Sequence, residues 1–178
     1  NRYYSLMMSD AFSNVFGYIG TRTTGSKSGT YLIVGPDWKG EKPKNVIKIY
    51  KSPTNLVWII GRTLVLNSKD IANVHKIQDN IKIEVINANS SQKKWQERMA
   101  FPKIKPGPPV EQIKAMDWKT YYTFLSKLMQ ENPAPSGQEE YVDDFKNINL
   151  AKGIDFEKEK LSNKQRKGLK IAFQDAMA

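Results

Sequence analysis

Polar and charged side chains interrupt segments that are otherwise apolar, and they are the first candidates for chemistry. They are an acid, two amides, a hydroxyl and two guanidinium groups, within or beside expected strands: Asp10, Asn14, Arg22, Thr54, Asn55 and Arg62. A guanidinium group presents planar, paired N–H donors that match a carboxylate or a phosphate. We therefore expect these residues to bind a small polar or anionic ligand, with Thr54 and Asn55 orienting it.

The same residues also have a purely structural interpretation. A charge within an apolar sheet is costly unless it is paired. Asp10 would then form an ion pair with Arg22 or Arg62 and stabilise the core. Asn55, which follows Pro53, would only complete a turn. The sequence leaves both interpretations open.

A weaker hypothesis concerns general-base catalysis. His75 is the single histidine, and Asp79 follows it at the spacing that places both on one helix face. A His–Asp pair can act as a general base with an orienting carboxylate, and Asp10 is a second candidate base. The alternative function is therefore a hydrolase-like enzyme acting on a small anionic or carbohydrate-like substrate. No serine lies in a Gly-x-Ser-x-Gly turn, so whether the protein is an enzyme stays undecided.

Aromatic side chains offer a second kind of contact, because their rings can stack on sugars or bases. Most of them recur at strand spacing, which predicts burial in a core. Trp38 lies in a short polar turn and is the best candidate for an exposed ring.

The composition of the chain limits which kinds of site and partner are expected. The chain has 178 residues, no cysteine and one histidine, so disulfides and thiolate metal sites are excluded and no metal site is predicted. No cofactor can be named. The net charge is +10, but lysines alternate with acids and no block of like charges occurs; binding to nucleic acid is therefore not favoured. No apolar run is long enough to predict a transmembrane segment.

The first half of the chain is typical of strands. Branched and aromatic residues, separated by glycine- and proline-containing turns, predict strands at 2–20 (with a bend near 10–14), 30–34, 46–50, 55–66 and 81–85. The segment 55–66 is nearly all apolar, which predicts a strand in the middle of a sandwich. Ser68 is expected to cap a helix near 68–79.

The second half is predicted to be helical. A proline-rich loop is expected at 87–110, with one helical turn near Trp95. Helices follow over 118–131, capped by Asp117, over 138–146, and after Ser162, the last burying Leu169, Ile171, Ala172 and Phe173. Residues 1–86 form the β-rich part and 111–178 the helical part of one domain. The predicted fold is α+β: an antiparallel β-rich sandwich or jelly-roll-like sheet followed by C-terminal helices.

Several segments together resemble a known bacterial family. They are Arg2-Tyr3-Tyr4-Ser5-Leu6, Gly20-Thr21-Arg22-Thr23-Thr24-Gly25, Tyr31-Leu32-Ile33-Val34-Gly35-Pro36, Ser52-Pro53-Thr54-Asn55 with Gly61-Arg62-Thr63, Pro108-Pro109-Val110-Glu111-Gln112, and Glu131-Asn132-Pro133. Their order and spacing are similar to the family called domain of unknown function 1254. The chain corresponds to roughly the C-terminal two-thirds of that domain.

The resemblance implies a compartment and partners but no established chemistry. Members of the family frequently carry a secretion signal, which implies an exported, periplasmic or secreted protein. They also have further upstream strands and are usually paired with a downstream domain of unknown function 1214. We therefore expect an uncharacterised exported module. An open edge of the sheet is expected to pair with another segment, either in a homo-oligomer, with flanking segments of the same protein, or with the downstream domain.

Overall fold

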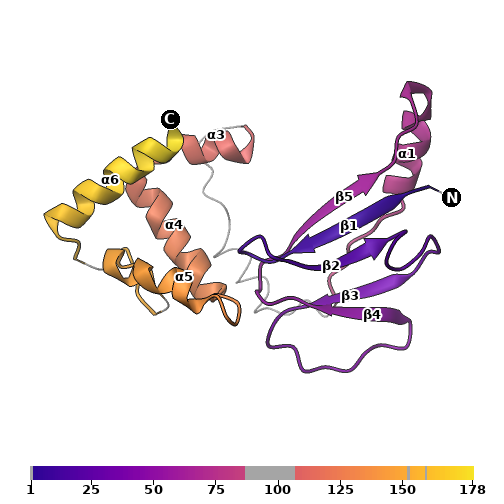
Figure 1. Ribbon diagram of the computed structural model, residues 1–178, viewed down its shortest axis with the longest axis horizontal. Helices are drawn as coiled ribbons and strands as arrows, with labels where there is room; N and C mark the ends of the chain where they lie inside the picture. The colour runs from indigo at the N-terminus through magenta and orange to yellow at the C-terminus, as the bar shows by residue number, and fades with distance from the viewer. Residues whose placement is uncertain (1, 87–106, 152, 159) are drawn as a thin grey trace. The chain divides into compact units, whose positions relative to one another are not determined.

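The computed structural model describes residues 2–86, 107–151, 153–158 and 160–178. The chain divides into two compact units, Asn1–Asn87 and Ala88–Ala178 (Figure 1). The first holds the strands and one helix, and the second holds only helices among its described residues, so the predicted α+β class is confirmed. The predicted loop at 87–110, apart from residues 107–110, and the predicted turn near Trp95 lie outside the described residues. Each unit has its own apolar core.

The strands of the first unit form two small sheets. The first sheet is antiparallel with the order β2-β1-β5: β1 (Tyr4–Ser9), β2 (Val15–Gly20) and β5 (Trp58–Thr63). The second pairs β3 (Thr30–Val34) with β4 (Val46–Lys51) in parallel. The expected bend near 10–14 is the turn between β1 and β2, and the register shifts just before it, between Met8 and Ser9.

Three details of the strand prediction are wrong. Strand β5 covers only part of the predicted segment 55–66, and it is an edge strand whose Trp58 is 60% exposed. Residues 81–85 form no strand, and Ile83 is exposed. The pair β3–β4 is parallel, whereas an antiparallel arrangement was expected. An apolar or alternating sequence pattern indicates which side chains prefer burial, but it does not specify which strand pairs with the segment.

Both sheets contribute to the core of the first unit. Met8, Ile19 and Tyr50 are buried there. The Tyr50 ring lies so close to Gly17 that an added Cβ at this glycine would be 2.5 Å from the ring. The Tyr50 hydroxyl donates to the carbonyl oxygen of Tyr18 at 2.7 Å, which ties β4 to β2. Burial raises the pKa of this hydroxyl.

An ion pair joins the start of the chain to the helical segment after β5. The Arg2 guanidinium forms a two-pronged contact with the Asp70 carboxylate, one prong at 2.7 Å. Asp70 also accepts from the backbone N–H of Leu66 at 3.0 Å. These donors stabilise the charged carboxylate, so they hold the pKa of Asp70 well below its usual range.

This depressed pKa predicts acid sensitivity. A carboxyl whose pKa is lower in the folded state stabilises the fold above its unfolded pKa of about 4, and the stabilisation is lost as the pH falls through the folded pKa. Urea unfolding measured between neutral pH and strong acid should therefore show a smaller loss of stability below about pH 4 for Asp70→Asn than for the wild type. Asp79→Asn, at an exposed position near the end of the same helix, is the control. If the stability of the wild type and of Asp70→Asn falls equally with pH, the lowered pKa of Asp70 is contradicted.

The predicted helix near 68–79 is confirmed as a 3-10 turn, Ser68–Asp70, followed by α1 (Ile71–Gln78). The capping residue was predicted wrongly. Asn67, one position earlier, accepts the backbone N–H of Lys69 at 3.0 Å. Ser68 itself lies within the 3-10 turn.

The helices of the second unit are α3 (Pro109–Lys114), α4 (Trp118–Glu131), α5 (Glu139–Asp143), the 3-10 helix η2 (Asp144–Ile148) and α6 (Asn163–Met177). Two of them, α4 and α6, begin at the predicted caps, whereas α3 was not predicted and its first two residues fall within the predicted loop 87–110. The Asp117 carboxylate accepts from the backbone N–H groups of Lys119 and Thr120. Ser162 and Gln165 form a reciprocal capping box at α6. The predicted helix 138–146 is divided into α5 and η2.

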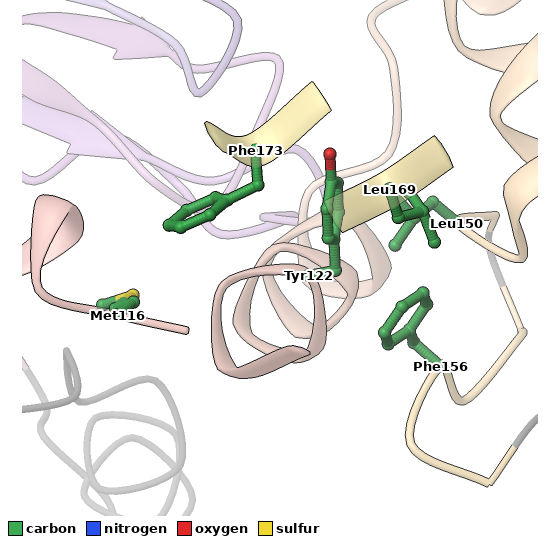
Figure 2. Packing of buried hydrophobic residues seen from close by; sticks show 6 residues of the cluster. All are labelled: Met116, Tyr122, Leu150, Phe156, Leu169 and Phe173. Atoms are coloured by element: carbon green, nitrogen blue, oxygen red, sulfur yellow. The ribbon is translucent and has the colours of Figure 1, made fainter. Parts of the chain in front are cut away.

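Aromatic rings dominate the core of the second unit (Figure 2). The Tyr122 ring of α4 lies 5.9 Å from the Phe156 ring, centroid to centroid. Leu169 and Phe173 of α6 are buried with them. The prediction that Ile171 and Ala172 are also buried is wrong, because Leu169 and Phe173 lie one turn apart on one helix face and the two predicted residues between them point elsewhere.

Candidate functional site

Asp10, one of the predicted ligand residues, lies inside the β1–β2 turn. Its Oδ1 accepts from the backbone N–H groups of Phe12 and Asn14, both at 2.9 Å, and its Oδ2 accepts from the Asn14 side-chain amide at 3.1 Å. Ser13 completes the turn in the left-handed conformation, with φ of 66°. Asp10 is buried, and its carboxylate is used to organise the backbone.

Thr54 connects the next loop to this turn. Its hydroxyl accepts from the backbone N–H of Ala11 at 2.9 Å and donates to the carbonyl oxygen of Leu56 at 2.8 Å. Thr54 is fully buried. Asn55 is exposed, and its Oδ1 would be 2.9 Å from a Cβ added to Gly35. Asp10, Asn14 and Thr54 thus lie around one turn, and their side chains stabilise its backbone by hydrogen bonds.

Arg22 and Arg62 lie elsewhere, and both are exposed. The predicted ion pair of Asp10 with one of them is not formed within residues 2–86. The Arg22 guanidinium instead lies over the Tyr3 ring, 5.6 Å from its centroid. Arg62 is opposite Ser5 in the β1–β5 register.

The registers of the antiparallel strands place Arg62 on the side of the sheet that faces away from the core, and Arg22, in the turn after β2, reaches this side through its contact with Tyr3. Tyr4, Leu6 and Met8 of β1 face the core, so residues 3, 5 and 7 point to the other side. Residues opposite these in the neighbouring strands share that side. We call this surface the open sheet face; it consists of Tyr3, Ser5, Met7, Tyr18, Trp58, Ile60, Arg62 and Leu64, with the Arg22 guanidinium over the Tyr3 ring.

The two arginines lie near the same end of β1. Arg62 is opposite Ser5, and the Arg22 guanidinium lies over the ring of Tyr3, two residues earlier in the chain. The exposed rings of Tyr3, Tyr18 and Trp58 border the same surface.

His75 occupies an exposed position on α1. The backbone N–H of Asp79 donates to the His75 carbonyl oxygen at 2.8 Å, which ends the helix. Between the two side chains, both of them described, there is no hydrogen bond or ion pair. The helix packs through Val74, the buried neighbour of His75.

The described part of the chain contains no group of three or more His, Cys, Asp or Glu side chains placed to hold a metal ion. None of its helices is long and apolar enough to cross a membrane.

Sequence reasoning missed two features of this region. Trp38, expected to be the best exposed ring, is half-buried against Gly40, whereas Trp58 is far more exposed. The pairing of Arg22 with Tyr3 also went unnoticed. The signal for Trp58 was strand parity, because it lies between Val57 and Ile59, which pack against the core. The contact of Arg22 with Tyr3 joins a turn to the start of a strand and had no such signal.

These features define an α+β module with an exposed sheet face that contains Arg62. Residues 1–85 match the model of the family described as Protein of unknown function (DUF1254). The resemblance inferred from the sequence motifs is thereby confirmed for the first unit, and the motifs near 108–112 and 131–133 lie beyond the matched range.

The fold is similar to that of a solved structure. This structure is the VPA0106 protein from Vibrio parahaemolyticus, with a TM-score of 0.61 and 19% sequence identity. The match covers 99% of this chain and 40% of that chain, so the chain spans less than half the length of this structural relative. Among curated proteins, no sequence matches the chain.

Proposed function

We propose that the first unit binds a small anionic ligand on the open sheet face. The observation that carries the proposal is that both arginines lie near the start of β1, where Arg62 is opposite Ser5 and the Arg22 guanidinium contacts the Tyr3 ring. A carboxylate or a phosphate is the group that two guanidinium ions recognise best.

The surroundings of the arginines indicate what else the ligand would contain. The Tyr3 ring holds the Arg22 guanidinium by a cation–π contact, which reduces the cost of ordering that side chain. Neither guanidinium donates to an acceptor among the described residues, so their N–H groups can serve a ligand. The rings of Tyr18 and Trp58 offer flat surfaces to an aromatic ring or a sugar. The proposed ligand therefore combines an anionic group with a ring.

Residues of the β1–β2 turn have a supporting role in this proposal. Asp10, Asn14 and Thr54 fix the ends of the strands that carry the face, and Asn55 remains an exposed amide outside it. Geometry favours binding over hydrolysis, because the Asp10 carboxylate is occupied by N–H donors and the His75 ring lacks an orienting carboxylate within the described segments. An exported location, and pairing with a downstream domain of unknown function 1214, are parts of the same proposal that rest on the family resemblance.

Arginine replacement tests the site. A thermal unfolding screen with ring-containing anions, such as adenosine monophosphate and phthalate, would find a probe, since a ligand at about 100 times its Kd adds roughly 2.7 kcal/mol. Arg22→Met and Arg62→Met should then each raise the Kd of that probe about tenfold or more, because each loses charge-assisted hydrogen bonds. The unfolding midpoint without ligand should stay the same.

Arg166→Met, at an exposed arginine of α6 in the other unit, is the matched control and should leave the Kd unchanged. A probe that binds equally well to the wild type and to both variants would place its site elsewhere. If no anion shifts the unfolding of the wild type, the proposal fails.

A further inference from the structure

The two edges of the antiparallel sheet differ in how their backbone groups are used. On β2, the backbone of Tyr18 and Gly20 points away from β1. The Tyr18 carbonyl oxygen accepts from the hydroxyls of Tyr50 and Thr23, and Gly20 exchanges hydrogen bonds with Thr23 and Thr24. This edge is therefore closed by the unit's own side chains and by the loop after β2.

The edge formed by β5 is open. Leu64 donates its backbone N–H to the Tyr3 carbonyl oxygen. In an antiparallel pair the residues of a strand bond alternately to one side and to the other, so the even-numbered residues of β5 bond to β1. Ile59, Gly61 and Thr63 therefore point their N–H and C=O groups away from β1. No residue in the described ranges pairs with these outward groups. The strand lies at the margin of the sheet (Figure 1); it contains no proline, and Arg62 is its one charged residue, so little in it protects the edge.

We propose that the β5 edge pairs with the β5 edge of a second copy of this chain. The two strands run antiparallel about a two-fold axis at Gly61, so Gly61 faces the second copy's Gly61 and Ile59 faces the second copy's Thr63. Every outward N–H then meets an outward C=O, which removes the unpaired backbone groups from water and from unwanted partners.

Side chains on the open sheet face are self-complementary in this register, and this favours a second copy over an unrelated strand. Trp58 lies opposite the second copy's Leu64, and these are exposed by 60% and 45% in the single chain. Ile60 lies opposite the second copy's Arg62, whose guanidinium is then diagonal to Trp58, within reach of a cation–π contact. The pairing thus buries apolar surface that a single chain leaves in water.

A charge-exchange experiment tests the register with the full chain. Sedimentation equilibrium over about 1–100 μM, where an interface of this modest size should be populated, should show a monomer–dimer equilibrium for the wild type. Trp58→Lys and Leu64→Glu should each weaken the dimer at least tenfold, because each places an unpaired charge against an apolar side chain. The double variant should recover to within a few fold, since each lysine then faces the second copy's glutamate.

Within one chain, positions 58 and 64 are about 20 Å apart along the strand, so recovery cannot come from an internal ion pair. Val15→Lys is the matched control: Val15 is 46% exposed but lies on β2, at the closed edge, and its variant should dimerise like the wild type. Circular dichroism verifies that each variant is folded. A wild type that is monomeric at about 100 μM, or a double variant that stays as weak as the single ones, overturns the proposal. The assay contains no ligand, so its outcome is independent of the proposed anion site.

Discussion

Phe156→Ala should lower the free energy of unfolding by about 3–5 kcal/mol. The Phe156 side chain is only 2% exposed and packs against the Tyr122 ring in the core of the second unit. Its removal loses the transfer free energy of the ring and leaves a cavity between α4 and the segment before α6. Urea unfolding followed by far-ultraviolet circular dichroism measures this loss, because the helices of this unit dominate that signal.

Tyr141→Ala is the matched control in the same unit. Tyr141 is 79% exposed on α5, so its removal should change the stability by no more than about 0.5 kcal/mol. Similar losses for the two variants would mean that burial of Phe156 does not stabilise this unit.

Helices of the second unit could be predicted closely because the determinants of their ends are local. Asp117 and Ser162 each bond to backbone groups within three residues, and such contacts are visible in the sequence. Burial along α6 was less predictable. Leu169 and Phe173 share a face at a spacing of four, and the partner residues Leu150 and Phe156 that select this face come from another segment.

Strand partners and sheet edges could not be predicted, because they depend on contacts distant in sequence. The apolar segment around β5 suggests burial on both sides, yet among the described residues β5 has a neighbouring strand on one edge only, and it exposes Trp58. The ion pair between Arg2 and Asp70 joins residues 68 positions apart and has no local signature. Residues 81–85 alternate like a strand, but no neighbouring strand pairs with them in the described parts of the chain.

The residue types of the candidate site could be predicted from the sequence more successfully than their arrangement in space. Arg22 and Arg62 come near each other only through the start of β1, because Arg62 is opposite Ser5 and Arg22 contacts Tyr3. Asp10 is separated from them by its own local bonds. The spacing of Asp10 and Asn14 around a short turn was the signal for this role, since aspartate side chains often accept from backbone N–H groups two to four residues later.

Asp10→Ala should lower the free energy of unfolding by about 2–4 kcal/mol, because the variant leaves the N–H groups of Phe12 and Asn14 without their acceptor in a partly buried turn. Asp10→Asn should cost only about 1 kcal/mol, since its remaining oxygen can accept both N–H groups and only the contact with the Asn14 amide is lost. Urea unfolding of the three proteins at neutral pH measures the difference.

The Asp10→Asn variant also separates a structural carboxylate from a catalytic one. An amide cannot accept a proton as a general base, so a hydrolase that used Asp10 would lose activity in a variant that is still folded. A brace for the turn would instead keep ligand affinity at the open sheet face unchanged, because the amide preserves the contacts that hold β1 and β2 in register. If the Asp10→Asn protein is stable but has lost all affinity for the anionic probe, Asp10 is a ligand-binding residue and not only a structural residue of the turn.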